Sequence, residues 1–308
     1  MKAVVTGGAG FIGSHLAEAL LDQGADVHVI DNLSSGRERR VPRDAELHVA
    51  DIRSKNCDEI IRGIRPDMLF HLAGQVDVAR SVHNPGYDAS INIGGTVRLL
   101  SVCRESGIRK FVFASTAAVY GDMREGRATE QSPIRPVSYY GLSKWAAESY
   151  IRLFHLLYGI PYTILRYSNV FGPRQVVGSE GGVIAAFIRQ LDEDGRIRVH
   201  GDGEQARDFI HVHDVVQANL AAARLGEKET IHVSTGVSVT LNRLIGLLQK
   251  IHGSDFEIEY GPAREGDIKH SCLDNRLAWE RLQWRPSRSL AEGVLEMYRD
   301  YAARKMDA

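Results

Sequence analysis

Cysteine is scarce in this sequence: Cys57, Cys103 and Cys272 are the three present among 308 residues, and no pair has CxxC spacing. An odd number of isolated cysteines argues against a disulfide framework and against a thiolate zinc site, and it fits a reducing compartment. Strand-like residues begin at Lys2, which leaves no room for a signal peptide ahead of them. We therefore expect a cytoplasmic protein.

Long apolar runs and excess charge are also missing. No apolar stretch approaches the roughly 20 residues that span a bilayer, and the formal net charge is −1. A nearly neutral chain has no general electrostatic attraction to nucleic acid or to anionic membranes. We expect neither as a partner, so any phosphate recognition has to be local.

What the chain does contain is a regular alternation of strand-like and helix-like segments. Six strand-like segments are separated by helical or loop stretches, at 3–6, 27–30, 47–49, 68–71, 110–114 and 162–166. Helices are expected near 14–23, 56–63, 84–106 and 138–158. This alternation predicts an α/β fold: a Rossmann-type, doubly wound parallel sheet with helices on both faces.

Beyond Arg166 the pattern is weaker, with helices expected near 183–191, 215–224, 240–252 and 290–305 and a strand at 230–233. We expect residues 1–166 to form the dinucleotide-binding domain, with 202–235 returning to it. Residues 167–201 and 236–308 are expected to form a smaller C-terminal substrate-binding lobe.

A glycine-rich turn follows the first strand and carries Gly7, Gly10 and Gly13. Gly7 allows the tight turn, Gly10 lets backbone approach a pyrophosphate, and Gly13 lets helix and strand pack closely. The N–H groups at the start of the following helix suit phosphate oxygens. Asp31 ends the second strand, where its carboxylate can accept both ribose hydroxyls and repel the 2′-phosphate of NADP. The pattern predicts an NAD site, and the alternative is that Asp31 only caps its loop.

Tyr140 and Lys144 are four residues apart on an expected helix, so their side chains share one face. A nearby ammonium, together with a positive nicotinamide ring, lowers the pKa of a phenol and makes it a usable general base. The hydroxyl of Thr116, at the end of a buried strand, can share the substrate proton. A solvated helix face is the alternative interpretation of this spacing.

Together these motifs resemble the extended short-chain dehydrogenases/reductases, and among them the UDP-glucose 4-epimerases. The matching segments are TGGAGFIG (6–13), DNLSSG (31–36), HLAGQ (71–75), NIGGT (92–96), STAAVYG (115–121), YYGLSK (139–144), RYSNVFGPRQ (166–175), GDGEQARDFIHVHD (201–214) and REGD (264–267). They cover nearly the whole chain. Thr116 stands where many epimerases have serine, and a threonine hydroxyl can do the same work.

The resemblance implies a set of cofactor contacts. Those expected at the pyrophosphate are Gly7, Gly10, Phe11, Ile12 and Gly13; those at the adenosine ribose are Asp31, Asn32, Ser35 and Gly36. Asp51 and Ile52 would contact adenine, and the remaining cofactor residues would be Leu72, Ala73, Gly74, Gln75, Asn92, Tyr140 and Lys144. NAD is the implied cofactor.

The resemblance also implies a substrate site and a reaction. Besides Thr116 and Tyr140, the residues expected at the UDP-sugar are Asn169, Val183, Arg207, Arg264, Asp267 and Ser271. Ser271 would form a wall of the hexose pocket, where a small residue admits N-acetyl sugars. The implied reaction is inversion at C4 of UDP-glucose, UDP-galactose and their N-acetyl forms through a 4-keto sugar, catalysed by Thr116, Tyr140 and Lys144 in a homodimer.

Alternatives remain at this point. A UDP-glucuronic acid 4-epimerase has nearly the same motifs. Dehydratases and decarboxylases of this family carry carboxylates just after the threonine, where this chain has Ala117 and Ala118, whose methyl groups move no proton. An NAD-sensing relative would typically lack the Tyr140–Lys144 pair.

The histidines of the HVHD segment, His211 and His213, replace the tyrosine and aspartate that are more usual in the family. Their i, i+2 spacing suggests a metal pair, but no third ligand is apparent nearby, and we expect no metal site. The sequence gives no reason for their presence.

Overall fold

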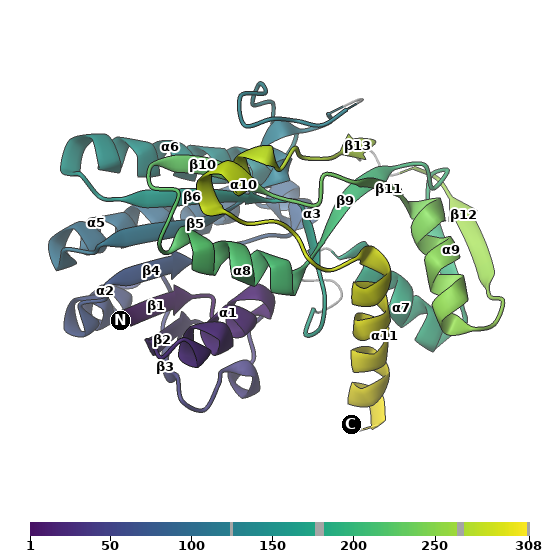
Figure 1. Cartoon of the computed structure of the whole chain (residues 1–308), viewed down its shortest axis with the longest axis horizontal. Coiled ribbons are helices and arrows are strands. Elements are labelled where there is room, and N and C mark those ends of the chain that lie inside the picture. The colour runs from purple at the N-terminus through teal and green to yellow at the C-terminus, as the bar shows by residue number, and fades with distance from the viewer. Residues whose placement is uncertain (124–125, 176–181, 264–267, 307–308) are drawn as a thin grey trace.

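A seven-stranded sheet organises the protein, whose computed structural model describes residues 1–123, 126–175, 182–263 and 268–306 (Figure 1). The strand order is β10-β6-β5-β4-β1-β2-β3, and every neighbouring pair is parallel. The strands are β1 (Lys2–Thr6), β2 (Asp26–Asp31), β3 (Glu46–Val49), β4 (Met68–His71), β5 (Lys110–Thr116), β6 (Tyr162–Tyr167) and β10 (Glu229–Val233). The order reverses between β1 and β4, which in such sheets is where ligands bind. The predicted fold class is confirmed.

Helices cover both faces of this sheet (Figure 1). One face carries α1 (Phe11–Asp22), α8 (Val212–Ala222) and α10 (Arg276–Leu282), and the other carries α2 (Lys55–Ile64), α5 (Thr96–Ser106) and α6 (Tyr139–Tyr158). Within β1, Ala3 and Val5 pack into the first core and Val4 into the second. Because both of its faces are buried, a central strand such as β1 is apolar on both sides rather than alternating.

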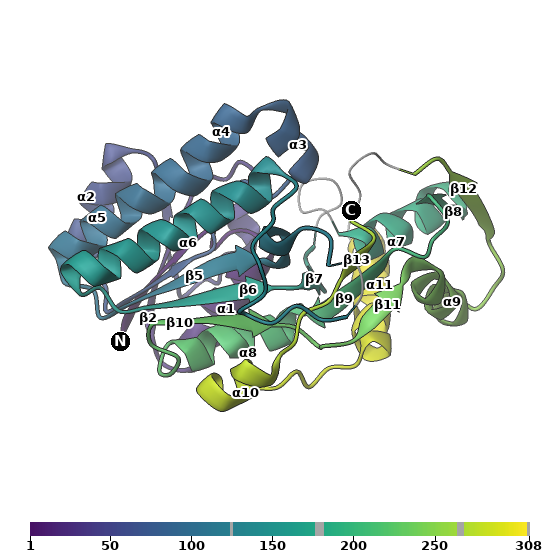
Figure 2. The ribbon, with the colours of Figure 1, turned by 90° about the horizontal axis from the view of Figure 1, so that it is seen from above.

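A second group of elements lies beyond the carboxyl ends of the strands and is called here the small lobe (Figure 2). Its strand β9 (Ala206–His211) pairs with β7 (Asn169–Phe171), β11 (Ser238–Thr240) and β13 (His270–Ser271). A two-stranded sheet joins β8 (Arg196–His200) to β12 (Glu257–Gly261). The helices α7 (Val183–Asp194), α9 (Leu241–His252) and α11 (Leu290–Met306) pack with these strands around a separate apolar core.

The chain passes between the two parts several times. Strand β9 belongs to the small lobe. It is followed by α8, which packs on the large sheet, and by β10, which is a strand of that sheet. The chain returns once more at α10, where Trp284 donates its indole N–H to the Asp214 carbonyl. The domain boundaries expected at 166, 202 and 235 stay a prediction.

The expected helix at 84–106 is three segments in the structure. After α3 (Val78–His83), α4 (Pro85–Ala89) begins with Asn84 as its cap and a proline at its first position, where the missing N–H costs nothing. A π-helical turn, η2 (Ser90–Gly95), then leads into α5. The short 3-10 segments are η1 (Glu38–Arg40) and η3 (Ala117–Tyr120). None of the described helices has the length and apolar composition needed to cross a membrane.

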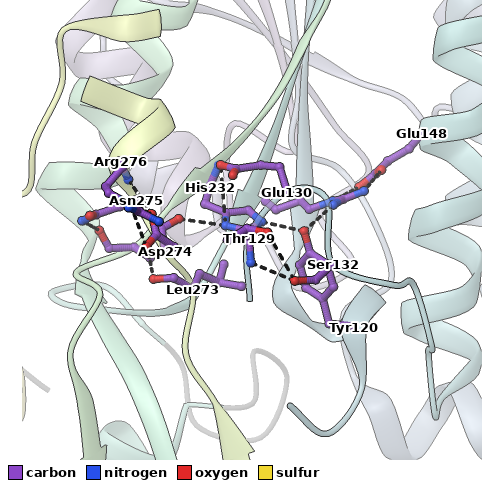
Figure 3. A network of polar contacts seen from close by, with 12 residues as sticks. Tyr120, Thr129, Glu130, Ser132, Glu148, His232, Leu273, Asp274, Asn275 and Arg276 are labelled. Atoms are coloured by element: carbon purple, nitrogen blue, oxygen red, sulfur yellow. Dashed lines mark hydrogen bonds and ion pairs between the residues drawn. The ribbon is translucent and has the colours of Figure 1, made fainter. Parts of the chain in front are cut away.

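A buried ion pair links the large sheet to α6 (Figure 3). Glu148 accepts from Arg166 Nε at 2.9 Å and from Arg166 Nη2 at 2.6 Å, and both side chains are almost fully buried. Ser115 and Arg152 also donate to this carboxylate. These donors hold the pKa of Glu148 below its usual value despite the burial.

The same pair continues into a chain of contacts (Figure 3). Arg166 donates to the Tyr120 hydroxyl, which lies 2.6 Å from His232 Nε2. The Nδ1 atom of His232 lies 2.9 Å from the carbonyl of Asp274, so that nitrogen carries the proton and Nε2 accepts from Tyr120. This series of contacts joins β6, η3, β10 and the segment before α10.

Replacing Glu148 by Gln leaves the Arg166 charge buried without its partner. We expect the Glu148→Gln variant to lose about 3–5 kcal/mol of unfolding free energy at pH 7, measured by denaturant unfolding. Because the folded-state pKa of Glu148 is lowered, its contribution is present above the ordinary glutamate pKa of 4.5 and disappears as pH falls through the folded value. The difference from wild type should therefore shrink in acid.

Glu105 provides the matched control, since it pairs with Arg62 at 2.7 Å on the surface. Exposed pairs contribute little, so Glu105→Gln should change the unfolding free energy by less than about 1 kcal/mol. Equal losses in the two variants would contradict the importance assigned to the buried pair.

Candidate active site

The glycine turn between β1 and α1 has no room for side chains. Gly7 has a positive φ of 72°, and a Cβ there would lie 2.7 Å from the Ala73 nitrogen. A Cβ on Gly13 would lie 2.2 Å from the Gly7 carbonyl oxygen, which is the close helix–strand packing predicted from the spacing. Gly10, the residue before α1, offers no side-chain cap. The N–H groups of the first turn of α1 are therefore left for an anionic group, as a pyrophosphate site requires.

Asp31 connects the end of β2 to this turn. Its Oδ2 accepts from the Ala9 N–H at 3.0 Å and its Oδ1 from the Leu33 N–H at 2.8 Å. Burial raises its pKa, and the two backbone donors oppose this. Asp31 therefore does cap its loop. Each carboxylate oxygen has a further lone pair for a ribose hydroxyl, so capping and ribose binding are compatible.

The other residues expected near adenosine surround this point. Gly36 packs against Asp31, since a Cβ on it would lie 2.8 Å from Oδ1. Asn32 donates to Asp51, whose carboxylate also pairs with Arg53 at 2.7 Å. The Arg53 hydrogen bonds lower the pKa of Asp51 to about 2. Among the other residues predicted to contact the cofactor, Phe11 and Ile52 are buried, Ile12 is half-buried and Ser35 is exposed.

The three predicted catalytic residues come from β5 and α6. Thr116 ends β5, and its hydroxyl is hydrogen bonded to Tyr140 in the first turn of α6. Burial raises the pKa of Tyr140 to about 12, against the effect of that hydrogen bond. The predicted lowering of the Tyr140 pKa required a positive nicotinamide ring beside the Lys144 ammonium, so for the protein with NAD bound it stays a prediction.

Lys144 is buried one turn further along α6. Its ammonium donates to the Ala114 carbonyl at 2.9 Å and lies 4.8 Å from the centre of the Phe113 ring. A Cβ on Gly74 would lie 3.2 Å from Nζ, so a side chain there would crowd the ammonium. Burial lowers the pKa of Lys144 to about 8, and the negative charges of Asp88 and Glu148 oppose this.

Asn92 joins the π-helical turn to this centre. Its side chain exchanges hydrogen bonds with the backbone of Gln75, accepting from N–H and donating to C=O, both at 2.9 Å. Its amide also lies 3.1 Å from the Ser143 hydroxyl on α6. Asp88 accepts from Gln75 Nε2 at 2.8 Å and from Asn92 at 3.2 Å. The other Asp88 oxygen is buried without a hydrogen-bond partner among the described residues.

The predicted cofactor segment Leu72–Ala73 follows β4 directly. The Leu72 N–H donates to the Thr6 carbonyl and the Ala73 N–H to the Thr6 hydroxyl. This holds the end of β4 against the end of β1, at the switch point of the sheet.

The predicted substrate residues come from the small lobe. Asn169 lies on β7, Val183 begins α7, and Arg207 lies on β9, which pairs with β7. Ser271 stands opposite Arg207 in the β9–β13 ladder and is buried. Arg264 and Asp267 lie outside the described residues. The structure thus brings Arg207 and Ser271 together, and whether they contact substrate stays a prediction.

His211 has a structural role. Its Nδ1 accepts from the His213 N–H at 3.3 Å and so caps α8, while its ring packs edge-on against Phe171. His213 is exposed.

Comparison with known proteins bears on this arrangement. A family model described as the NAD dependent epimerase/dehydratase family matches residues 3–234. The chain belongs to this family. It is 42% identical over 292 residues to a putative UDP-glucose 4-epimerase of Methanocaldococcus jannaschii, covering 94% of this chain and 95% of the relative.

Two solved structures are similar over essentially their whole length. One is the UDP-glucose 4-epimerase of Thermotoga maritima with UDP-glucose, at a TM-score of 0.96 and 40% identity, covering 100% of each chain. The other is the UDP-N-acetylglucosamine 4-epimerase of Methanobrevibacter ruminantium in complex with UDP-N-acetylmuramic acid, at a TM-score of 0.93 and 35% identity, covering 98% of each chain.

The polar residues that surround the predicted catalytic residues were not predicted. Asp88 and Glu148 are buried carboxylates beside the predicted catalytic residues, and Ser115 precedes Thr116. Tyr140, Lys144 and Glu148 are spaced four residues apart, so they share one helix face. This spacing could have identified Glu148 from the sequence. Asp88 gave no comparable signal, because the residues it contacts are brought to it by the fold.

Asp88→Asn tests the electrostatic environment of Lys144. The asparagine oxygen can still accept from Gln75 and Asn92, but the negative charge that raises the pKa of Lys144 is gone. We expect the Lys144 pKa to fall below its value of about 8, measured by 13C NMR titration of the lysine Cε signals with Lys144→Met as the assignment variant.

The control is Asp58→Asn, which removes a carboxylate paired with Arg98 between α2 and α5. It should leave the Lys144 titration unchanged. An Asp88→Asn protein in which Lys144 titrates as in wild type would contradict the assigned coupling.

Proposed function

We propose that this protein is a UDP-sugar 4-epimerase that uses NAD. The observation that carries the proposal is the hydrogen-bonded Thr116–Tyr140 pair with buried Lys144, next to a glycine turn that leaves the start of α1 uncapped. Its similarity along the full chain to UDP-glucose 4-epimerases supports the reaction.

Tyr140 is the group that takes the proton from the sugar 4-hydroxyl. Thr116 is hydrogen bonded to it and orients the phenol hydroxyl for the proton transfer. Since burial keeps the Tyr140 phenol protonated in the protein alone, the base forms only when positive charge is present beside it. Lys144 supplies part of that charge, and Asp88 and Glu148 keep its ammonium protonated.

NAD fits the residues present, and when bound it accepts hydride from C4 and returns it. The glycine turn and the start of α1 would hold the pyrophosphate, and Asp31 the adenosine ribose. Tyr140, Lys144 and Asn92 would lie at the nicotinamide end. The prediction of NAD over NADP rests on the Asp31 charge.

The small lobe would hold the UDP part, with Arg207 binding phosphate through its planar guanidinium. Fixing the nucleotide allows the 4-keto sugar to turn and present its other face. Binding energy is then concentrated on the part of the substrate that does not change.

The substrate range we propose includes UDP-glucose/UDP-galactose and the N-acetyl pair, because Ser271 is small. The test is to separate the products formed from UDP-glucose, UDP-GlcNAc and UDP-glucuronate by chromatography. Conversion of both of the first two supports the proposal. Conversion of UDP-glucuronate alone would replace it with a UDP-glucuronic acid 4-epimerase, and no conversion of any would reject an epimerase.

Tyr140→Phe removes one hydroxyl and keeps the ring. We expect a fall in kcat of about 10²–10⁴-fold, the usual contribution of a general base, with NAD binding retained. Steady-state kinetics and NAD titration measure the two effects. Tyr139→Phe is the matched control, because Tyr139 is the neighbouring residue and is 47% exposed; it should keep wild-type turnover, and an active Tyr140→Phe enzyme would refute the assignment.

We also propose a homodimer that uses α6. Large apolar side chains are exposed along this helix, among them Leu153 at 47%, Leu156 at 78% and Leu157 at 60%. An apolar helix face of this kind marks an interaction site, and a two-fold axis would pair it with its copy. The expected cytoplasmic location stays a prediction.

Leu156→Glu places a charge in this face and should convert the dimer to a monomer, measured by light scattering at micromolar concentration. Leu225→Glu changes a leucine that is 39% exposed in the turn after α8, outside α6, and should leave the mass unchanged. A wild-type monomer would reject the dimer.

A further inference from the structure

Three potential metal ligands meet on the edge of the large sheet, away from the candidate active site. His28 Nδ1 lies 3.1 Å from His48 Nε2 and 3.3 Å from Glu46 Oε2. His48 Nε2 lies 3.7 Å from Glu46 Oε1. Among the described residues this is the group of histidine and acidic side chains whose ligand atoms come close enough to share an ion.

Strand register brings these side chains together. His28 on β2 stands directly opposite Glu46 on the edge strand β3, and His48 follows Glu46 by two residues. Paired residues, and residues two apart, lie on the same face of a sheet. All three side chains therefore project to one side of the sheet. Their spacing along the sequence does not match a metal-binding motif.

The separations suit a small divalent ion. A zinc ion bound at about 2.0–2.1 Å by tetrahedral ligands places neighbouring donor atoms about 3.3 Å apart. The 3.1 Å between the imidazole nitrogens and the 3.3 Å from His28 to Glu46 Oε2 are close to that value, and His48 lies 3.7 Å from the other Glu46 oxygen, Oε1. Two imidazoles and a carboxylate form a donor set that zinc accepts, with water in the fourth position.

The surroundings of His28 add a second observation. Its side chain is largely buried, and its Nε2 has no hydrogen-bond partner among the described residues. The Asp26 carboxylate lies 3.6 Å from Nε2. At that distance the carboxylate does not accept a hydrogen bond from the ring, but it places a negative charge beside the far nitrogen of His28.

We propose that His28, Glu46 and His48 form a binding site for one divalent transition metal ion of the zinc class. The ion joins the edge strand β3 to β2, three residues before Asp31. The site is structural, and it is independent of the proposed epimerase reaction. Without a metal, the two imidazoles share one hydrogen bond.

The experiment uses the full-length protein after treatment with EDTA and removal of the chelator. Cobalt(II) is titrated in and followed by visible absorption, and zinc is then used to displace it. We expect one equivalent to give the strong bands of a four-coordinate site, zinc to abolish them, and millimolar magnesium to leave them unchanged because magnesium prefers oxygen ligands. Added zinc should also raise the melting temperature.

Glu46→Gln and His48→Gln test the assignment at half-exposed or exposed positions, where the fold should tolerate the change. Each should weaken zinc binding at least tenfold, as measured by competition with a chelating indicator. His200→Gln is the control, since this histidine is exposed on another strand, β8, and should bind zinc as wild type does.

The proposal is overturned if no stoichiometric cobalt or zinc binding occurs, or if the Glu46 and His48 variants bind as His200→Gln does. It is also overturned if the absorption is the weak spectrum of six-coordinate cobalt. Because binding and melting are measured without substrate, a failed epimerase assay would leave this result standing, and the reverse also holds.

Discussion

The buried carboxylate of Glu148 holds α6 in place against the sheet. One carboxylate accepts from Ser115 on β5, from Arg166 on β6 and from Arg152 on its own helix. A buried charge is tolerated only when such partners saturate it. Tyr140 and Lys144 lie two turns and one turn earlier on the same helix. Any slide of α6 along the sheet that displaced them would also break these bonds. The accuracy of the catalytic geometry is thus set by an ion pair that takes no part in the chemistry.

Burial also decides the electrostatics of the site. The spacing of Tyr140 and Lys144 led to the expectation that the ammonium, together with a positive nicotinamide ring, lowers the pKa of the phenol. In the folded protein both groups lose solvent, and each shifts toward its neutral form: the Tyr140 pKa rises to about 12 and the Lys144 pKa falls to about 8. The ammonium is directed at the Ala114 carbonyl. Both residues lie on α6 one turn apart, as predicted, and in the protein alone desolvation determines the direction of their pKa shifts.

Much of the fold could be predicted because its signals are local. The continuous apolar strands and the helices between them predicted the parallel sheet, and the glycine spacing predicted the packing of Gly13 on Gly7. The strands of the small lobe were not predicted: β7, β11 and β13 are only two or three residues long, and the longer strands β8, β9 and β12 were missed as well. The pairing of β7, β11 and β13 with β9 joins segments far apart in the chain. The contacts of Asp88 and the cluster of His28, Glu46 and His48 also join segments far apart in the chain. No periodicity in the sequence predicts them.

The repeated passage of the chain between the large sheet and the small lobe limits how the two can move. The backbone crosses from β6 to β7, from β9 to α8, from β10 to β11, and again on either side of α10. A hinge needs few connections, because each one must absorb the rotation. Here a rotation of the lobe would strain all of these connections together and pull on β6 and β10 within the sheet. The two parts should therefore melt in one cooperative transition, and a sugar that turns between them would do so inside walls that stay still.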